Sequence, residues 1–188
     1  MNSLAFLGGI LMEKIVILNK STFELSEDDK KQLWLFLSDT FESNFSKEDL
    51  SHCLGGYHLL AYHEEELIGH VSVVRRSMIV GDKPMYVGYV EAMAVRKSHQ
   101  CQGVGTKLML KVSEIIEKSF DMGALCPSDE GMKLYQKMGW LPWKGALEEF
   151  HLDGIKQSTE PVILFLNKQK EIDNKLSLIA DFRAGDIW

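Results

Sequence analysis

The sequence predicts a single α/β domain with a mixed central sheet, an antiparallel N-terminal meander and flanking helices. Three observations lead to this fold class. Residues 57–95 contain three strand-like segments separated by short turns, which is typical of antiparallel strands. Residues 103–118 then change to a helical period, and strand-like segments recur after this helix. The length of 188 residues fits one domain, since domains are typically about 100–200 residues long.

The N-terminal third is expected to hold one strand and two helices. The strand is Lys14–Asn19, a short apolar run. The capping box Ser26–Asp29 predicts a helix that reaches about Glu42, with its apolar side chains on one face. A second capping box, Ser46–Asp49, opens a short helix that is ended by Gly55 and Gly56.

The rest of the chain continues the sheet. The meander consists of strands at Tyr57–His63, Leu67–Val80 and Met85–Val95. A helix follows at Gly103–Lys118, where Val104 and Leu108 recur on one face. The later elements expected are a strand at Met122–Cys126, a helix at Ser128–Met138, a strand at Val162–Leu166 and a partly helical tail at Lys168–Trp188. We therefore expect the strand order of the sheet to change near Val95.

The cysteines and the apolar segments limit the class of protein. The three cysteines are odd in number and form no C-x-x-C pair, which disfavours a disulfide framework or a structural zinc site and favours the reducing cytoplasm. No apolar run approaches the roughly 18 residues of a membrane span, so no membrane partner is expected. Residues 1–12 lack the features of a signal peptide. We expect them to be a disordered or alternative-start extension, and residues 13–188 to form one domain.

Charge is distributed unevenly along the chain. The net charge is −6, yet residues 96–118 contain five cations and two acids. An acidic protein with one basic segment is poorly suited to bind nucleic acid. Such a protein can hold an anionic ligand at the basic segment and a cationic ligand elsewhere. The alternative is that these charges only solvate the surface.

A glycine-rich turn at Gln100–Gly105 is the most specific chemical motif in the sequence. It follows a strand and opens an amphipathic helix, a context in which main-chain N–H groups and the helix dipole favour phosphate oxygens. Gly103 and Gly105 would let a ligand approach the backbone closely, although two glycines can also serve only a tight turn. No Gly-Lys-Ser/Thr follows, which excludes a Walker loop, and the preceding meander disfavours a dinucleotide fingerprint.

This turn resembles the signature Gln/Arg-x-x-Gly-x-Gly/Ala of the GNAT superfamily of acyl-CoA-dependent N-acetyltransferases. The resemblance implies the GNAT fold, and it implies acetyl-CoA as co-substrate with the amides of the turn around its pyrophosphate. It also implies that Met93–Val95 pairs with the pantetheine arm, beside a bulge that the small Ala92 and Ala94 allow. The cofactor-binding residues expected in this way are Met93, Ala94, Val95, Gln100, Cys101, Gln102, Gly103, Val104 and Gly105.

Four further stretches resemble one branch of that superfamily, the aminoglycoside 2'-N-acetyltransferases. They are Leu54-Gly-Gly-Tyr-His58, Gly88-Tyr-Val-Glu91, Gly139-Trp-Leu-Pro-Trp143 and Asp181-Phe-Arg-Ala-Gly-Asp-Ile-Trp188. The resemblance runs from about Phe41 to Trp188, and the last two stretches are not general to the superfamily. It implies transfer of acetyl from acetyl-CoA to the 2'-amino group of an aminoglycoside by direct attack in a ternary complex. It also implies a homodimer.

Two residues are the candidates for acid–base catalysis. Glu91 stands in a strand where an apolar residue is expected, and a buried carboxylate is costly unless it has a partner or a function. It is either a satisfied structural carboxylate or, as the resemblance implies, the group that accepts the proton of the amine. Tyr135 lies at helical spacing, which is typical of a core tyrosine. The resemblance instead directs its hydroxyl at the coenzyme sulfur, as general acid.

The acceptor site is expected to be acidic, because aminoglycosides are polycations and each shielded charge-assisted hydrogen bond contributes roughly 1.5–3 kcal/mol. The resemblance implies contacts from Asp186 and the terminal carboxylate of Trp188, and from Asp49, which is equally a capping-box residue. This chain has Asn44 where the family has an acid, and Cys126 where serine is common. A shortened acidic loop leaves Glu160 or Thr159 as substitutes. The expected substrate-binding residues are Asn44, Asp49, Glu91, Ala92, Cys126, Glu160, Asp186 and Trp188.

Other interpretations were weighed against this one. His52, His58 and His63 beside Cys53 suggest a metal site, but His58 and His63 fall on opposite faces of a regular strand, so no metal is expected. Cys126 is interpreted as a small wall residue rather than a nucleophile. The rival functions are acetyl transfer to another cationic amine, such as a polyamine or a cell-envelope amino sugar, and a non-catalytic coenzyme A-dependent sensing module.

Overall fold

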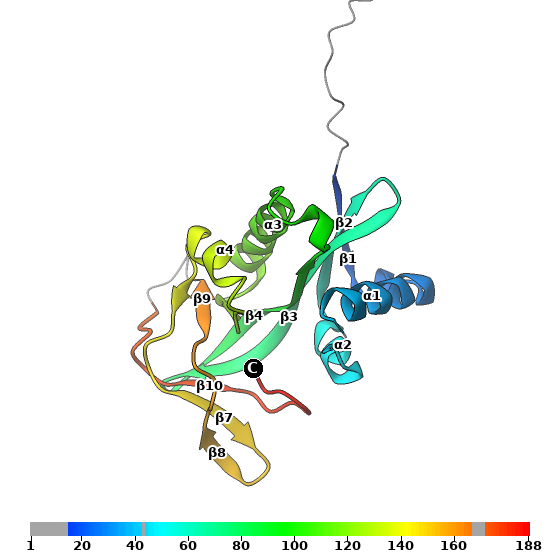
Figure 1. The fold of residues 1–188 in the computed structure, drawn as a ribbon. Coiled ribbons are helices and arrows are strands. Elements are labelled where there is room, and N and C mark those ends of the chain that lie inside the picture. The colour runs from blue at the N-terminus through cyan, green and yellow to red at the C-terminus, as the bar shows by residue number, and fades with distance from the viewer. Residues whose placement is uncertain (1–14, 43, 167–171) are drawn as a thin grey trace, which may run out of the picture.

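The structure, a computed structural model, describes residues 15–42, 44–166 and 172–188. Within them a mixed sheet of ten strands carries α3 and α4 on one face and α1 and α2 on the other (Figure 1). The α-helices are α1 (Glu27–Thr40), α2 (Lys47–Cys53), α3 (Val104–Ser119) and α4 (Met132–Lys137). The strands are β1 (Val16–Ser21), β2 (Tyr57–His63), β3 (Glu66–Val80), β4 (Lys83–Val95), β5 (Met122–Leu125), β6 (Leu141–Pro142), β7 (Leu147–His151), β8 (Gly154–Gln157), β9 (Leu164–Leu166) and β10 (Leu178–Ala180). Short 3-10 turns lie at Thr22–Glu24 and Lys97–His99.

The predicted meander is confirmed as β2, β3 and β4, which pair antiparallel in chain order. The main path of the sheet is β6-β9-β5-β4-β3-β10-β7-β8, and β2 with β1 joins a separate part of β3. Because β4 pairs parallel with β5, the strand order changes after β4, as the change of period near Val95 predicts. The predicted mixed α/β sheet with flanking helices is therefore confirmed.

β4 is irregular near its carboxyl end. Its register against β3 slips by one residue between the pairs Ser72–Glu91 and His70–Ala94, which is a β-bulge. Ala92 lies in this bulge with φ of 45°, in the left-handed region that side chains rarely adopt. Pairing of β4 with β5 includes only Val87–Tyr89. On this edge, residues 90–95 of β4 therefore have no strand partner among the described residues.

β3 is long enough to hold two different neighbours on one edge. Its first half pairs with β2 as far as Val73, and its last residues, Ile79 and Val80, pair with β10. Residues 74–78 lie between the two partners. Gly56 closes the β2 end of this interval, since a Cβ there would lie 2.0 Å from the main-chain oxygen of Val73. The interval is where the C-terminal segment crosses the sheet (Figure 1).

Two capping boxes and a glycine fix the helix starts. Ser26 accepts the N–H of Asp29 at the start of α1, and Ser46 accepts the N–H of Asp49 at the start of α2, as predicted. α3 begins after Gly103 and buries an apolar face against the sheet. The buried residues of that face are Val104, Leu108, Met109, Val112 and Ile116. No helix among the described residues has the length and apolarity to span a membrane.

The C-terminal third differs from the prediction in three places. The partly helical tail is wrong for residues 172–188, where β10 pairs with both β3 and β7; residues 168–171 lie outside the described ranges. The helix predicted from Ser128 begins only at Met132, because a turn in which Ser128 accepts the N–H of Gly131 precedes it. The shortened loop expected before the last strand, residues 145–160, contains the β7–β8 hairpin. The predicted extension at residues 1–12 lies outside the described residues.

Candidate active site

The glycine-rich turn exposes its main chain. Cys101 and Gly103 adopt positive φ angles of 59° and 83°, and Gly103 is the N-cap of α3. No side chain of the described residues caps this helix, and its first turn holds no acidic residue. The side chains of Gln100 and Gln102 donate to the main-chain oxygens of Val95 and Ser98, at 3.0 and 2.8 Å. The first amides of α3 are thus available to an anion.

Gly105 connects this turn with the open edge of β4. A Cβ at Gly105 would lie 3.2 Å from Met93 Cε and from Leu134 Cδ2, a distance closer than most real contacts. Met93 and Val95 pack against the core under α3. The predicted cofactor-binding residues, Met93–Val95 and Gln100–Gly105, therefore form one continuous strip along β4 and the start of α3.

Glu91 lies on the other side of the bulge and has a cationic partner. Its side chain is 15% exposed, and its Oε1 accepts a hydrogen bond from Nη1 of Arg183, which is also 15% exposed. Arg183 belongs to the segment after β10. The sequence expectation of an unusual buried carboxylate is correct, but its arginine partner was missed because 92 residues separate the two positions.

Cys126, which follows β5, contacts a predicted acceptor residue. Its Sγ lies 3.4 Å from Glu160 Oε2. Desolvation, the charge and hydrogen bond of Glu160, and the charges of Asp186 and Glu91 together raise the pKa of Cys126 to about 12. The thiol therefore stays protonated at neutral pH, which agrees with a wall residue and not with a nucleophile.

Tyr135 lies near Cys126. It is buried on α4, and its ring packs edge-on against Trp140 at a centroid distance of 6.3 Å. Burial and then the charge of Cys126 raise the pKa of Tyr135 to about 12. The hydroxyl is thus protonated at neutral pH and near Cys126, which keeps both the core and the general-acid interpretation open.

The C-terminal segment is fastened to the sheet by two arginines. Arg76 on β3 is buried and donates to Asp181 Oδ1 at 2.8 Å and to the main-chain oxygen of Ile187. Arg183 donates from Nε to the main-chain oxygen of Asp186 at 2.7 Å and from Nη2 to that of Trp188 at 2.9 Å. Asp186 is exposed, whereas Trp188 is 5% exposed and packs in the core. The predicted contact through Trp188 therefore involves a residue that is also structural.

The remaining predicted acceptor residues lie at α2 and before it. Asp49 Oδ2 accepts the N–H of Ser46 at 2.7 Å, which is the capping role. Burial and then the charge of Glu91 raise the pKa of Cys53 on α2, so this helix lies near Glu91. Asn44 is exposed. Among the described residues, the side chain of Asp49 has its capping contact and that of Asn44 has no defined contact.

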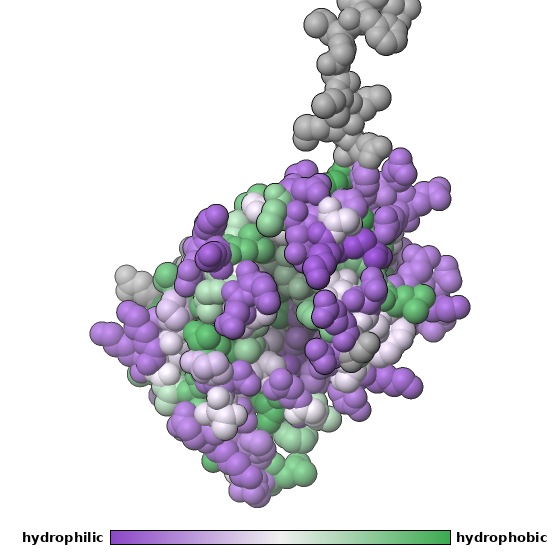
Figure 2. All heavy atoms as spheres, viewed as in Figure 1, coloured by the Kyte–Doolittle hydropathy of each residue, from purple (hydrophilic) through white to green (hydrophobic). Residues whose placement is uncertain are grey.

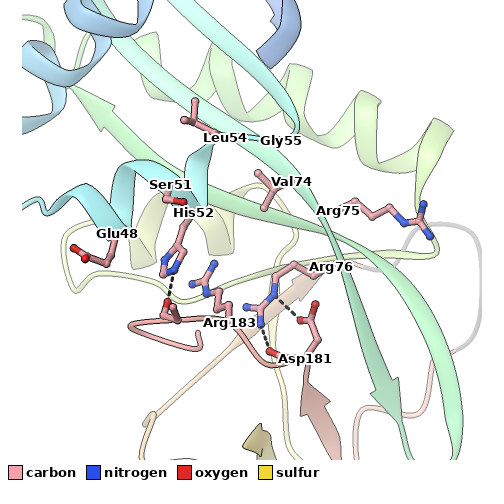
Figure 3. A pocket seen from close by; sticks show the side chains of 11 residues that line it. Glu48, Ser51, His52, Leu54, Gly55, Val74, Arg75, Arg76, Asp181 and Arg183 are labelled. Carbon is pink, nitrogen blue, oxygen red and sulfur yellow. Dashed lines mark hydrogen bonds and ion pairs between the residues drawn. The ribbon is translucent and has the colours of Figure 1, made fainter. Parts of the chain in front are cut away.

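A pocket of about 420 Å³ lies in the interval on the edge of β3. Its walls come from α2, β3 and the C-terminal segment, and His52 closes one end by a 2.7 Å contact with the main-chain oxygen of Ala184 (Figure 3). The lining includes Glu48, His52, Arg75, Arg76, Asp181 and Arg183. Figure 2 shows this face hollowed over the middle of β3 and β4, with hydrophilic side chains on the rim. Arg183 belongs both to the lining of the pocket and to the contacts of Glu91.

Two polar atoms under the site have no partner within the described ranges. They are Tyr89 Oη and Trp188 Nε1, and both are buried. Burial and the charge of Glu91 raise the pKa of Tyr89, so its hydroxyl remains a donor. Buried polar groups usually find a partner, and these two are therefore candidates to bind a ligand or water. Sequence analysis gave no signal for Tyr89, which is a residue type typical of a core, and it expected Trp188 to bind through its terminal carboxylate, not through Nε1.

A pair of buried histidines supports the bulge. His70 Nδ1 lies 2.9 Å from the main-chain oxygen of Ala92, so it must donate. Its Nε2 then accepts from His58 Nδ1 at 3.1 Å, and His58 Nε2 accepts from the hydroxyl of Thr22 at 2.9 Å. Burial lowers the pKa of His58 to about 4 and that of His70 to about 3. The two histidines of the suggested metal site thus have different partners: His58 contacts His70, and His52 contacts the main-chain oxygen of Ala184. Within the described residues no cluster of three or more metal-ligating side chains is found.

Comparison with known proteins agrees with this architecture. Residues 19–140 match the Acetyltransferase (GNAT) family. The chain belongs to the GNAT acetyltransferase family. It is 32% identical over 187 residues to the aminoglycoside 2'-N-acetyltransferase of Mycolicibacterium fortuitum, covering 96% of this chain and 94% of that protein. The predicted relation to that branch is therefore confirmed, and the chain is an N-acetyltransferase.

Solved structures show the same fold at low sequence identity. The GNAT N-acetyltransferase YhbS from Escherichia coli, in complex with CoA, superposes with a TM-score of 0.66 at 14% identity, over 90% of this chain and 89% of that chain. Escherichia coli ElaA superposes with a TM-score of 0.59 at 18% identity, over 82% of this chain and 100% of that one. The predicted GNAT fold is confirmed.

Proposed function

We propose that this N-acetyltransferase transfers acetyl from acetyl-CoA to the 2'-amino group of an aminoglycoside, by direct attack in a ternary complex. The observation that carries the proposal is the position of the Glu91 carboxylate beside the bulge of β4, together with the contact of Glu160 with Cys126. The identity with an aminoglycoside 2'-N-acetyltransferase along nearly the whole chain supports the same substrate class. A polycation is the ligand that such a group of carboxylates suits.

Acetyl-CoA would bind along the strip formed by β4 and the start of α3. The uncapped amides after Gly103 suit its pyrophosphate, and the open edge of β4 at Met93–Val95 suits the amides of its pantetheine arm. A side chain at Gly105 would press against Met93 and Leu134 and fill this strip. The residues present thus fit the co-substrate. The CoA complex of the similar fold YhbS is consistent with this assignment.

The chemistry requires one base and one acid. The acceptor's neutral amine attacks the thioester carbonyl, the new amide bond forms, and the carbon–sulfur bond breaks. Glu91 would accept the proton that the amine loses, directly or through a water molecule. Tyr135, whose pKa is raised to about 12, would donate a proton to the departing thiolate. Oxidation states do not change. Between turnovers Glu91 loses its proton and the Tyr135 phenolate regains one, so amine and acetyl-CoA give amide and the free thiol of CoA with no net proton release.

A thiol-release assay with acetyl-CoA tests this function. The acceptors should include two aminoglycosides that differ only in an amine or a hydroxyl at position 2', together with a polyamine and an amino sugar. Turnover with the 2'-amine alone supports the proposal, and mass spectrometry should place one acetyl group on that amine. Turnover with only the polyamine or the amino sugar would favour another cationic acceptor. Acetyl-CoA binding without turnover of any amine would favour a sensing module.

We also propose that the enzyme acts as a cytoplasmic homodimer without nucleic-acid or membrane partners. The family resemblance is the basis for proposing a dimer. The three free cysteines are the basis for proposing a reducing compartment. Sedimentation equilibrium of the purified enzyme measures the oligomeric state. A mass of one chain across the micromolar range would contradict the dimer.

A further inference from the structure

Arg183 is the residue through which the C-terminal segment reaches Glu91. All three nitrogens of its guanidinium donate: Nη1 to Glu91, Nε to the main-chain oxygen of Asp186, and Nη2 to that of Trp188. Its side chain is 15% exposed, and its Cζ also lies 5.6 Å from the ring centroid of Tyr89. A planar guanidinium whose three nitrogens all donate hydrogen bonds fixes the orientation of each group that it contacts.

We propose that Arg183 is a positioning residue, which pairs with the Glu91 carboxylate and holds one of its oxygens so that the other faces the acceptor amine. This inference rests on the proposed function, because it assumes that Glu91 accepts the proton of that amine. Arg183 takes Oε1, and no hydrogen bond to Oε2 is found among the described residues. The free oxygen is the one available for the amine or for a bridging water.

Within the described ranges, Glu91 has one direct cationic contact, Arg183 of the C-terminal segment. Its charge also acts on Cys53 of α2, on Tyr89 of β4 and on Cys126 after β5. The nearby arginine of β3, Arg76, is already paired with Asp181. Arg183 is therefore the arginine of the site that contacts the Glu91 carboxylate directly.

Docking of the segment does not by itself require the contact with Glu91. Arg76 holds both Asp181 and Ile187, and His52 contacts Ala184. The segment thus has other anchors at its start, its middle and its end. An arginine that served only to attach the segment would not need to reach the carboxylate on β4. This is the reason to assign Arg183 a role in the chemistry of Glu91.

The test compares Arg183→Ala, Arg183→Lys and the control Lys156→Ala. Lys156 is an exposed cation on β8 that pairs with Asp153 and does not line the pocket. The first measurement is the titration of the Glu91 carboxyl by ¹³C NMR, assigned with Glu91→Gln. Arg183→Ala should raise this pKa, since it removes the opposite charge beside the carboxylate. Arg183→Lys should restore most of the shift, and Lys156→Ala should change nothing.

The second measurement is the pH profile of kcat/KM with any amine that the enzyme accepts. In Arg183→Ala the acidic limb should move to higher pH by the same amount, so that activity recovers partly at alkaline pH. A merely structural role would lower activity equally at every pH. An unchanged Glu91 titration overturns the inference, and so does a shifted titration with an unmoved acidic limb. If no amine is acetylated, the proposed function fails, while the NMR titration still decides whether Arg183 pairs with the Glu91 carboxylate. If Arg183→Ala does not fold, Arg183→Gln supplies the uncharged variant.

Discussion

The two sides of the β4 bulge are built by different means. On the α3 side, the proposed acetyl-CoA strip consists of main-chain groups from two nearby stretches, Met93–Val95 and Gln100–Gly105. On the opposite side, the proposed acceptor site consists of side chains from β4, from the segments near Cys126 and Glu160, and from the C-terminal segment.

This difference teaches where specificity can change. A main-chain site depends on backbone conformation, and substitutions of its exposed side chains leave the amides in place. A side-chain site changes its charge with one substitution, as Asn44 illustrates at a position where an acid is expected. We therefore expect donor and acceptor recognition to respond separately to mutation, and the following predictions test that separation from the largest effect to the smallest.

Glu91→Gln should give the largest loss. General base catalysis is typically worth about 10²–10⁴-fold, so kcat/KM for the acceptor should fall by that order while KM for acetyl-CoA stays nearly constant. Steady-state kinetics with each substrate varied in turn measures both quantities. An equal rise in KM for acetyl-CoA would show that the two sides are not separable.

Tyr135→Phe should lower kcat by about tenfold to a hundredfold, because it removes the hydroxyl that protonates the thiolate. The ring remains, so its packing on Trp140 and the stability of the fold should change little. Tyr86→Phe, at an exposed ring on β4, is the matched control. A Tyr135→Phe enzyme with wild-type kcat would assign Tyr135 to the core alone.

Gly103→Val should raise KM for acetyl-CoA by about tenfold, because the left-handed conformation is strained for a branched side chain and the turn must rearrange. A Cβ at Gly103 would meet no atom within 4 Å, so crowding does not contribute. Gly154→Val is a matched control, since Gly154 also has positive φ and open space, in the β7–β8 turn. Both variants should lose about 1–2 kcal/mol of stability, but only Gly103→Val should affect acetyl-CoA.

Stability should fall as the pH decreases from about 6.5 toward 4. The pKa values of His58 and His70 are lowered to about 4 and about 3 by burial, so the unfolded chain binds their protons first. The loss approaches about 1.4 kcal/mol per pH unit for each histidine within this window, and vanishes above it. Urea unfolding at a series of pH values measures it. The double variant His58→Leu/His70→Leu should show a flatter dependence; an equally steep one would place the titrating groups elsewhere.

Asp186→Asn should have the smallest effect, a rise of a few-fold in KM for the acceptor, because Asp186 is exposed and exposed ion pairs are weak. A point substitution is the appropriate test. Deletion of residues 186–188 would also remove Ile187 and Trp188 from the core. An acceptor KM unchanged in both Asp186→Asn and Glu160→Gln would show that these carboxylates do not contact the substrate.

The sequence predicted the elements whose signals are local. Alternation gave the strand Tyr57–His63 with its observed bounds, and capping boxes gave the starts of α1 and α2. β10 has only three residues and exists because β3 and β7 pair with it, so no local period reveals it. β7 and β8 likewise have no apolar alternation that would predict strands, because they lie at the end of the sheet and contain charged residues.

The candidate site also contains residues with a local signal and residues without one. The glycine turn and Glu91 can be predicted from the sequence, because glycines before a helix and a carboxylate within an apolar strand are both unusual. Nothing in the local sequence distinguishes Arg183 and Arg76 from other arginines. Their contacts form only because the fold places the C-terminal segment on β3 and β4. The contact of Glu160 with Cys126 likewise forms only through tertiary packing.

The histidine pair constrains how this protein can evolve. Each imidazole accepts a hydrogen bond from one neighbour and donates one to the next. Replacing one histidine alone therefore leaves a buried donor or acceptor of the other histidine without a partner. Single-step exchange is therefore penalised, whereas simultaneous exchange for two apolar residues can be tolerated. Among homologous sequences, His58 and His70 should consequently be present together or be replaced together, although twelve positions separate them.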